Sequence, residues 1–257
     1  MNAPLLATHG LSVDIGGRCV ARALDLTIET GQRLAILGRN GAGKSTLLAT
    51  LAGLREPASG RIELGGSPYA ALTPRAAALR RAWLGQTQAD PFGSTVLETA
   101  LTGRHPHLGR WDWESQRDTD LALGALAAVG LADMDERQIH TLSGGERQRL
   151  AIATLLAQAA PLYLLDEPLA HLDLNHQMAV LELFAGAARD CGAGVIMVLH
   201  DPALAHRFCD RALLIDGDGN CELGAVDAVL TAEKLSALYG YPLRQFQDSG
   251  RRSFIPD

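Results

Sequence analysis

Three short runs of apolar residues with no charged interruption mark the chain at residues 34–37, 162–165 and 195–199. Such runs predict strands buried on both faces, as in a parallel sheet covered by helices. Each run is followed by residues that can carry chemistry, namely Gly38, the pair Asp166 and Glu167, and His200. Because open α/β sheets bind ligands at the carboxyl ends of their strands, the pattern predicts an α/β fold with a functional site at that edge.

A different pattern, the alternation of apolar and polar residues, occupies the first part of the chain. It covers residues 11–15, 24–28 and 61–64, and the pair Gly16-Gly17 reads as a turn between the first two. Alternation of this kind predicts antiparallel strands with one face buried and one exposed. We therefore expect an N-terminal antiparallel β subdomain beside the mainly parallel sheet.

Two segments in the middle of the chain, residues 95–102 and 115–129, follow a helical period. They predict an α-helical subdomain inserted into the core, whereas the polar tail from Gln245 is expected to be loose. The expected parts of this single domain, residues 1–257, are a core at about 5–94 and 141–241, a helical subdomain at 95–140 and a C-terminal tail at 242–257.

Composition gives little positive indication of function, but it argues against some classes of protein. Apolar residues make up 47% of the chain and charged residues 20%, which is ordinary for a globular protein. The net charge of −6 predicts no nucleic-acid partner, since that would favour a basic face. The four cysteines form no CxxC pair or metal-binding spacing. The most apolar region, residues 151–165, is too short to span a bilayer, so any membrane role is expected to come through a partner.

The loop after the first apolar run carries a phosphate-binding motif. Residues 38–45, Gly-Arg-Asn-Gly-Ala-Gly-Lys-Ser, fit GxxxxGK[ST] between a predicted strand and a helix from residue 44 to 52. Its glycines allow backbone N–H groups to wrap a β-phosphate, while Lys44 reaches the β- and γ-phosphates and Ser45 binds Mg²⁺. A chance glycine turn is the alternative, and the strand–loop–helix context argues against it. The motif predicts a nucleoside triphosphate ligand.

A second phosphate-binding pattern lies about a hundred residues later, at residues 142–150, Leu-Ser-Gly-Gly-Glu-Arg-Gln-Arg-Leu. Two glycines after a serine expose backbone N–H groups, and the helix-forming run at 146–158 directs its positive N-terminal end at the same point. A serine N-cap with a glycine turn is the alternative. One domain has little reason to grip one nucleotide twice, so the pair suggests that two copies of the chain share their ligands.

Polar residues after the other two apolar runs complete the expected site. Asp166 is placed to hold Mg²⁺, through water, and Glu167 to polarise the water that attacks the γ-phosphate. An N-cap before Pro168 is an alternative role for the two acids and does not exclude the first. His200 is placed to hydrogen-bond the γ-phosphate and hold the attacking water, although a lone histidine is more often structural.

Together, in this order, these motifs resemble the ATPase subunit of ABC transporters, from about Leu5 to Tyr241. The resemblance implies a P-loop NTPase core, with Gln86 as the loop glutamine that senses the γ-phosphate and contacts the membrane partner, and Gln88 as its minor rival. It implies catalytic roles for Glu167, His200 and Gln86, and Mg²⁺ ligands at Ser45, Gln86 and Asp166. It implies ATP-binding roles for Gly38, Arg39, Asn40, Gly41, Ala42, Gly43, Lys44, Ser45, Thr46 and Ile15. The resemblance also implies that six residues act on the ATP held by a partner copy: Leu142, Ser143, Gly144, Gly145, Glu146 and Gln148. It places Leu172 and Asp173 at the dimer interface.

One position departs from the family pattern. Family members usually stack an aromatic ring on adenine near the end of the first strand, and this chain has Ile15 there. An isoleucine offers apolar contact but no π-face. The guanidinium plane of Arg18 or Arg22 is the substitute we consider, and we expect weak discrimination between ATP and GTP.

Three local segments resemble the importers of iron siderophores, haem and cobalamin, although each also reads as an ordinary turn or helix end. They are residues 103–107 (Gly-Arg-His-Pro-His), 172–177 and 235–240. We interpret the nearby Trp111 and Trp113 as packing inside the helical subdomain. The resemblance implies a head-to-tail homodimer that hydrolyses ATP with Mg²⁺ to power import through a polytopic permease, with a separate substrate-binding protein, at the cytoplasmic face of the inner membrane. The alternative is a soluble ABC ATPase that transports nothing, such as an iron–sulfur cluster assembly ATPase.

Overall fold

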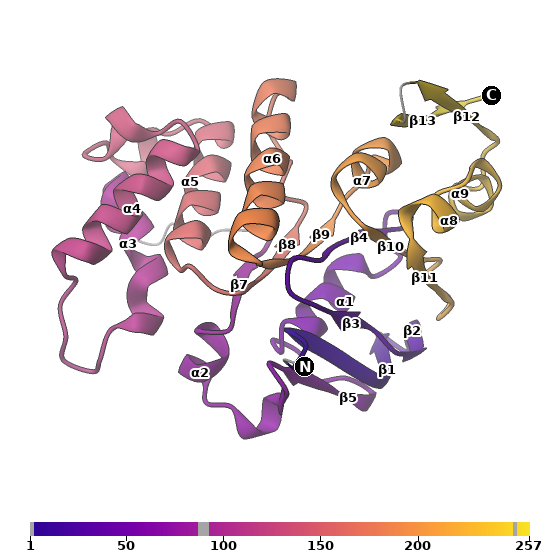
Figure 1. Cartoon of the computed structure of the whole chain (residues 1–257), viewed down its shortest axis with the longest axis horizontal. Coiled ribbons are helices and arrows are strands. Elements are labelled where there is room, and N and C mark those ends of the chain that lie inside the picture. The colour runs from indigo at the N-terminus through magenta and orange to yellow at the C-terminus, as the bar shows by residue number, and fades with distance from the viewer. Residues whose placement is uncertain (1–2, 87–92, 249–250) are drawn as a thin grey trace.

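The computed structural model describes residues 3–86, 93–248 and 251–257. Its main sheet has six strands in the order β11-β10-β4-β9-β8-β7, all parallel except β11, which is antiparallel to β10. The strands are β4 (Arg33–Leu37), β7 (Arg81–Leu84), β8 (Leu162–Asp166), β9 (Gly194–Val198), β10 (Arg211–Ile215) and β11 (Cys221–Ala225). The three apolar runs thus form the adjacent central strands β4, β9 and β8, as predicted (Figure 1).

These strands are apolar throughout because each of their faces packs into a different core. In β4, Ala35 and Leu37 belong to a core shared with the long helices, whereas Leu34 and Ile36 belong to a core shared with the antiparallel sheet. Residues of β8 and β9 alternate in the same way. Side chains alternate along a strand, so a strand covered on both sides must be apolar at every position.

The second sheet is antiparallel and lies below the main sheet in Figure 1. Its strands are β1 (Leu6–Ile15), β2 (Arg18–Leu24), β3 (Thr27–Ile28), β5 (Ser59–Leu64) and β6 (Ser67–Pro68). The prediction of one strand at residues 24–28 is wrong. Ala23 has a φ of 49°, and the Asp25 carboxylate accepts a hydrogen bond from the Gly10 backbone N–H at 2.7 Å, so the chain turns between β2 and β3.

The remaining helices of the core cover the two faces of the main sheet. They are α1 (Lys44–Leu51), α2 (Pro74–Ala78), α6 (Leu174–Cys191), α7 (Pro202–Phe208), α8 (Val226–Val229) and α9 (Ala232–Tyr239), with a short 3₁₀ turn η1 (Tyr69–Ala71). In Figure 1, α6 and α7 lie above the sheet and α1 lies between the two sheets. No helix in the described part of the chain is long and apolar enough to cross a membrane.

The middle of the chain is helical, as predicted, and gathers at the left of Figure 1. It contains α3 (Val96–Leu101), η2 (Thr102–His107), α4 (Gln116–Ala128), η3 (Ala132–Met134), η4 (Ile139–Thr141) and α5 (Gly144–Ala157). Thr95 and Ser115 cap α3 and α4, and each exchanges reciprocal hydrogen bonds with an acid three residues later. These capping boxes explain why sequence periodicity located both helix starts closely.

An ion pair fixes η2 within this helical region. Arg104 Nε donates to Asp118 Oδ1 at 2.8 Å, and both residues are buried. Arg104 Nη1 also donates to the Ala157 carbonyl at the end of α5. Hydrogen bonds from Ser115 and the Arg104 guanidinium hold the pKa of Asp118 far below its usual range. The segment that the sequence singled out at residues 103–107 therefore joins α4 to α5.

Trp111 and Trp113 do not pack inside the helical region, so that interpretation is wrong. Their exposed fractions are 82% and 88%. They lie in the loop between η2 and α4, and the Arg110 guanidinium lies 5.5 Å from the ring centroid of Trp111. The buried side chains of this segment are instead Arg104 and Asp118, which pair with each other.

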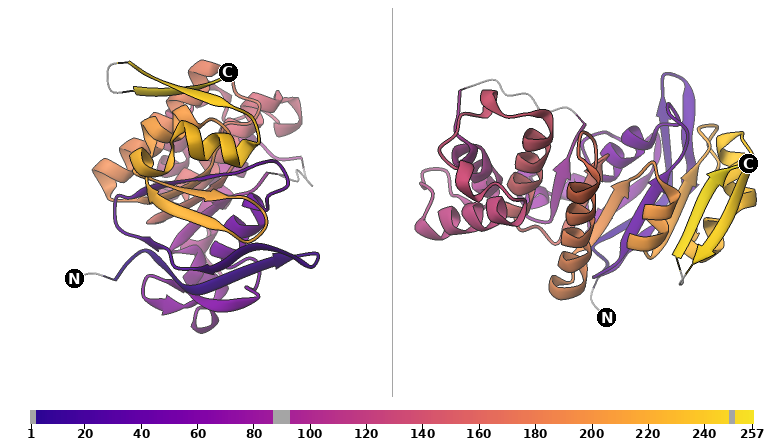
Figure 2. Two further views of the ribbon diagram at one scale, coloured as in Figure 1. Left: turned by 90° about the vertical axis from the view of Figure 1, so that its right-hand side faces the viewer. Right: turned by 90° about the horizontal axis from the view of Figure 1, so that it is seen from above.

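The prediction of a loose polar tail is also wrong. The strands β12 (Leu243–Asp248) and β13 (Arg251–Pro256) pair in an antiparallel hairpin that lies beside α7 and α9 (Figure 2). Arg252 anchors it, because Nη2 lies 2.8 Å from Asp227 Oδ1 and Nη1 donates to the Asp227 carbonyl at 2.9 Å. Polar composition concealed this hairpin, since its contacts are with distant segments: the ion pair of Arg252 with Asp227 and the packing of Leu243 and Phe254 against the helical core.

Candidate active site

The loop between β4 and α1 turns sharply around the Lys44 side chain. Gly43 caps α1 with a φ of 94°, and a Cβ there would lie 2.6 Å from the Val20 side chain. Lys44 is only 5% exposed, and its Nζ donates to the carbonyls of Gly38 at 2.9 Å and Arg39 at 3.0 Å. Burial lowers the pKa of this ammonium, and the charges of Glu167 and Asp166 oppose that effect. The Lys44 ammonium group is therefore held beside the glycine loop that the motif predicted.

Side chains from four different elements meet at the carboxyl edge of the main sheet. Asp166 ends β8, and its Oδ1 accepts a hydrogen bond from Ser45 Oγ on α1 at 3.1 Å. Gln86, just after β7, donates from Nε2 to Ser45 Oγ at 3.0 Å and to Glu167 Oε1 at 3.1 Å. His200, just after β9, places Nε2 2.9 Å from the same Glu167 oxygen. The parallel register of β7, β8 and β9 creates this cluster.

The backbone and burial of the two acids differ. Glu167 has a φ of 51°, an uncommon value for a non-glycine residue, and such strain concentrates at functional sites. Asp166 is 3% exposed, and burial raises the pKa of its carboxyl, partly opposed by the hydrogen bond from Ser45. The neighbouring acids therefore present one buried and one more accessible carboxyl group.

A cavity of about 560 Å³ connects the glycine loop to this cluster. Its lining residues were all named by the sequence: Ile15, Asn40, Gly41, Gly43, Lys44, Ser45, Thr46, Gln86, Glu167 and His200. Gly38, Arg39 and Ala42 do not line it. The first two hold Lys44 through their carbonyls, and a Cβ on Gly38 would lie 2.5 Å from the Ile215 carbonyl oxygen.

The fit of Mg²⁺ to this cluster differs among the three ligands that the sequence suggested. Ser45 Oγ and Asp166 Oδ1 are adjacent oxygen atoms, which are the ligands that Mg²⁺ prefers. Gln86 directs its amide nitrogen at Ser45 and Glu167, so its oxygen would face the cation only after the amide rotates by half a turn. The described residues contain no group of three or more His, Cys, Asp or Glu side chains that could hold a metal. Ser45 and Asp166 therefore fit, with water or phosphate oxygens as further ligands.

The second phosphate-binding pattern forms the start of α5. Ser143 is the N-cap, its Oγ accepts from the Glu146 N–H at 3.3 Å, and Glu146 Oε2 accepts from the Ser143 N–H at 2.7 Å. Donation from the Ser143 backbone N–H, and then from its hydroxyl, lowers the pKa of the Glu146 carboxyl. The helix begins at Gly144, earlier than the predicted residue 146, so both glycines lie in its first turn. A Cβ on Gly145 would lie 3.1 Å from the His171 carbonyl oxygen, which favours glycine there.

The residues of this pattern line a different hollow from the 560 Å³ cavity. Among the described residues, none of 142–148 lines that cavity, whereas Gly144, Arg147 and Gln148 line a neighbouring hollow of about 170 Å³ together with Gln86 and His171. Leu142 is buried. Gln148 Nε2 donates to the Pro168 carbonyl at 3.0 Å, so α5 is tied to the loop that follows Glu167.

The segment after Glu167 leads into α6. Leu172 is nearly buried, and Asp173 caps α6, with Oδ1 accepting from the His176 N–H at 3.0 Å and lying 2.8 Å from His176 Nδ1. The hydrogen bonds from His176 lower the pKa of Asp173. Gln88, the rival of Gln86, lies outside the described residues.

Comparison with known proteins agrees with this geometry. Residues 21–170 match the family model described as ABC transporter. The chain belongs to this family. It is 42% identical to the hemin import ATP-binding protein HmuV of Nocardia farcinica, over 93% of this chain and 83% of the relative. It is 39% identical to the cobalamin import ATP-binding protein BtuD of Halobacterium salinarum, over 91% of this chain and 58% of the relative.

A solved structure resembles the whole ABC ATPase chain. It is described as an inward-facing conformation of a metal-chelate type ABC transporter, and it matches with a TM-score of 0.85 and 30% identity over 99% of this chain and 98% of the other. The resemblance to ABC ATPases inferred from the sequence motifs is therefore confirmed. The chain is an ATP-hydrolysing enzyme of the ABC type.

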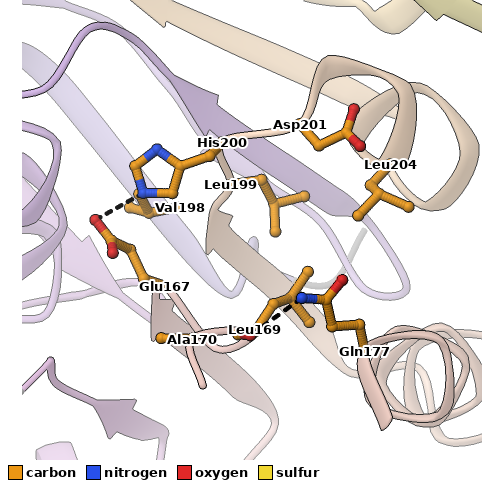
Figure 3. Close-up of a pocket in the computed structure, with 9 residues that line it drawn as sticks. All are labelled: Glu167, Leu169, Ala170, Gln177, Val198, Leu199, His200, Asp201 and Leu204. Carbon is orange, nitrogen blue, oxygen red and sulfur yellow. Dashed lines mark hydrogen bonds and ion pairs between the residues drawn. The ribbon is translucent and has the colours of Figure 1, made fainter. Parts of the chain in front are cut away.

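The structure of this ABC ATPase also reveals a second cavity that sequence reasoning missed. It has a volume of about 210 Å³ and shares Glu167 and His200 with the first cavity (Figure 3). Its other walls are largely apolar, from Leu169, Leu199 and Leu204. These leucines gave no functional signal, because apolar residues at strand ends and on helices read as core. His171, which lines the 170 Å³ hollow and has a φ of 63°, was also missed, because a backbone conformation is not visible in a sequence.

Proposed function

We propose that the 560 Å³ cavity binds ATP and that the cluster at its inner end hydrolyses it. The observation that carries this proposal is the convergence of Lys44, Ser45 and Glu167 on one cavity, with Asp166 hydrogen-bonded to Ser45 at its edge. Lys44 neutralises the β- and γ-phosphates, and the glycine loop supplies N–H donors. Ser45 and Asp166 would hold Mg²⁺, whose positive charge would stabilise the transferring phosphoryl group.

Glu167 is the residue that we propose to polarise the attacking water. Gln86 donates to Glu167 Oε1, and His200 lies within hydrogen-bond distance of the same oxygen. Two donors on one carboxylate oxygen fix its orientation, which a general base requires. His200 then holds the water or the γ-phosphate once the nucleotide is bound, because it lines the same cavity.

We propose further that two copies of the chain assemble head to tail and share two ATP molecules. Ser143 and the first turn of α5 form a helix N-terminus suited to an anion, yet they do not line their own chain's cavity. The γ-phosphate held at Lys44 of a second copy supplies the missing anion. In this arrangement Asp173 lies at the interface between the copies.

Mixing two inactive variants tests the shared site. Lys44→Ala removes the phosphate grip and Ser143→Arg blocks the other half, so each variant alone is expected to be inactive. A mixed dimer has one site built from the intact Lys44 of one chain and the intact Ser143 of the other. A 1:1 mixture should therefore recover about a quarter of wild-type hydrolysis. A mixture as inactive as its components would contradict the shared site.

We propose that hydrolysis powers import through a membrane permease at the cytoplasmic face of the inner membrane, with a separate substrate-binding protein delivering the solute. The relatives named for hemin and cobalamin import and the metal-chelate transporter support this class of solute. The exposed loop of Trp111 and Trp113 offers a docking surface for the permease. It follows η2, which is bonded to the end of α5 through Arg104, so force on the loop reaches Ser143 at the other end of that helix.

Reconstitution tests the proposed transport. The chain is purified with its permease in lipid vesicles, and hydrolysis is measured with cobalamin, haem or a ferric siderophore presented by the binding protein. Stimulation by one of them, with accumulation inside the vesicle, supports import of that solute. ATP hydrolysis without any permease associating in the cell would instead favour a soluble ABC ATPase.

A further inference from the structure

The ATP cavity has two chemically different ends. Gln86, Glu167 and His200 occupy the end where the γ-phosphate is hydrolysed, and Ser45 and Lys44 hold the phosphates beside them. The base of the nucleotide must therefore lie toward Ile15, which belongs to the antiparallel sheet and is 43% exposed. Among the described residues that line the cavity, the one aromatic ring is the His200 imidazole at the phosphate end, so the base needs another planar partner at the Ile15 end.

Arg18 is placed to provide that partner. Ile15 and Arg18 face each other across the turn between β1 and β2, and the side chains of directly paired residues lie on the same face of a sheet. Arg18 Nη1 donates to the carbonyl of Gly41 at 3.3 Å, and Gly41 lines the cavity. The guanidinium thus reaches from the hairpin to the glycine loop, at the Ile15 end of the cavity.

The loop after β10 holds the guanidinium from the other side. Arg18 Nη2 lies 3.5 Å from Asp218 Oδ1. Asp216 fixes this loop, because its Oδ1 accepts from the Asp218 N–H at 2.7 Å and from the Asn220 N–H at 3.2 Å. Gly217 has a φ of 88°, and a Cβ there would lie 2.7 Å from Arg18 Nη2. Any side chain at residue 217 would therefore meet the guanidinium.

Arg22, the other arginine that the sequence suggested, is directed elsewhere. Its backbone N–H donates to the Gly219 carbonyl at 3.1 Å, and its Nη2 would lie 3.6 Å from a Cβ on Gly219. No contact described for Arg22 reaches the glycine loop, whereas Arg18 Nη1 donates to the Gly41 carbonyl. Arg22 therefore serves as a matched control with the same charge on the same strand.

We propose that the guanidinium plane of Arg18 packs against the purine base of the bound nucleotide, with Ile15 supplying apolar contact beside it. The inference rests on the proposed assignment of this cavity as the ATP site. Arginine stacks on aromatic faces, and proteins stack nucleic-acid bases on guanidinium planes. Gly41 and Asp218 contact the Nη atoms at the edge of the plane, and stacking would use its face. Because every purine has such a face, the contact holds ATP and GTP with similar affinity.

Nucleotide binding by Arg18 variants tests the proposal. Arg18→Ala removes the plane and the charge, whereas Arg18→Lys keeps the charge and removes only the plane. Equilibrium binding of ATP, GTP and inorganic tripolyphosphate is measured for both variants, for Arg22→Ala and for the wild type, with unfolding temperature without nucleotide as the test of folding. Stacking predicts that both Arg18 variants bind ATP and GTP about five- to tenfold more weakly. Tripolyphosphate binding to Arg18→Lys and all binding to Arg22→Ala should be unchanged.

Three results would overturn the proposal: wild-type ATP affinity in Arg18→Ala, full rescue by Arg18→Lys, or a large preference of the wild type for ATP over GTP. Rescue by lysine would mean that only charge matters at residue 18. The same measurement on Lys44→Ala separates this proposal from the site assignment. If Lys44→Ala keeps its tripolyphosphate affinity, the cavity is not the phosphate site. If Lys44→Ala loses this affinity while Arg18→Ala binds ATP normally, the site assignment stands and only the stacking proposal is refuted.

Discussion

His200 Nε2 lies 2.9 Å from Glu167 Oε1, although the two residues belong to different strand–loop connections (Figure 3). Glu167 follows β8 and His200 follows β9, and these strands are hydrogen-bonded parallel neighbours. Parallel strands end at the same edge of a sheet, so residues that follow them meet there. The proposed base, Glu167, and the proposed orienting histidine, His200, are therefore positioned by the pairing of two buried strands.

Glu167→Gln should abolish most hydrolysis while preserving ATP binding. The amide keeps nearly the same shape but cannot take a proton from water, and general-base catalysis typically contributes 10²–10⁴-fold. We expect steady-state hydrolysis to fall by about that factor and ATP to trap a dimer that gel filtration detects. Turnover close to the wild-type rate would show that Glu167 is not the base.

His200→Ala should also slow hydrolysis, by about 100-fold, because Glu167 loses its orienting contact. When two residues act as one unit, the losses of rate caused by substituting each of them do not add as free energies. The double variant with Glu167→Gln should therefore be scarcely slower than Glu167→Gln alone, as measured by single-turnover hydrolysis. Fully multiplicative losses would mean that the two side chains act independently.

Asp118→Asn should destabilise the helical region without touching the ATP cavity. The substitution leaves the Arg104 guanidinium buried without its counter-ion, and breaking one side of a buried pair costs about 3 kcal/mol. Asp120→Asn is the matched control, since Asp120 is exposed on the same helix and should change the free energy of unfolding by less than about 0.5 kcal/mol. Urea unfolding measures both, and equal effects would refute the role given to Arg104.

The same ion pair predicts how stability depends on pH. The pKa of Asp118 is lowered in the folded chain, so folding favours its ionised form. The stabilisation of the fold by ionised Asp118 is fully present above the pKa of this carboxyl in the unfolded chain, about 4. It is lost as the pH falls through the lower pKa of the same carboxyl in the folded chain. The gap in unfolding free energy between wild type and Asp118→Asn should be constant above about pH 5 and shrink on acidification below about pH 4. A gap independent of pH would contradict this assignment.

Replacing Trp111 and Trp113 by serine should weaken association with the permease, by at least about tenfold, and leave folding intact. Both indoles are exposed, so the free energy of unfolding should change by less than about 0.5 kcal/mol. Exposed tryptophans are enriched where proteins meet. Co-purification with the permease measures the effect, and Leu54→Ser, another exposed apolar position, is the control. Undiminished association would place the permease contact elsewhere.

Residues whose chemistry depends on local spacing could be predicted from the sequence. The glycine loop, the acids after β8 and the serine–glycine pattern at residues 142–150 each use groups a few residues apart, so the chain itself carries the pattern. Strands such as β4 and β8 were visible because burial on both faces requires an apolar residue at every position.

Contacts between distant segments were decided only by the tertiary structure. The exposure of Trp111, the hairpin anchored by Arg252 and the choice of Arg18 over Arg22 depend on which surfaces other elements cover. A sequence shows that a residue is apolar or charged, but not which neighbour competes for the space beside it. The sequence by itself thus determined the fold class and the residue types of the candidate site, whereas packing decided which side chains lie around the cavity and which remain exposed.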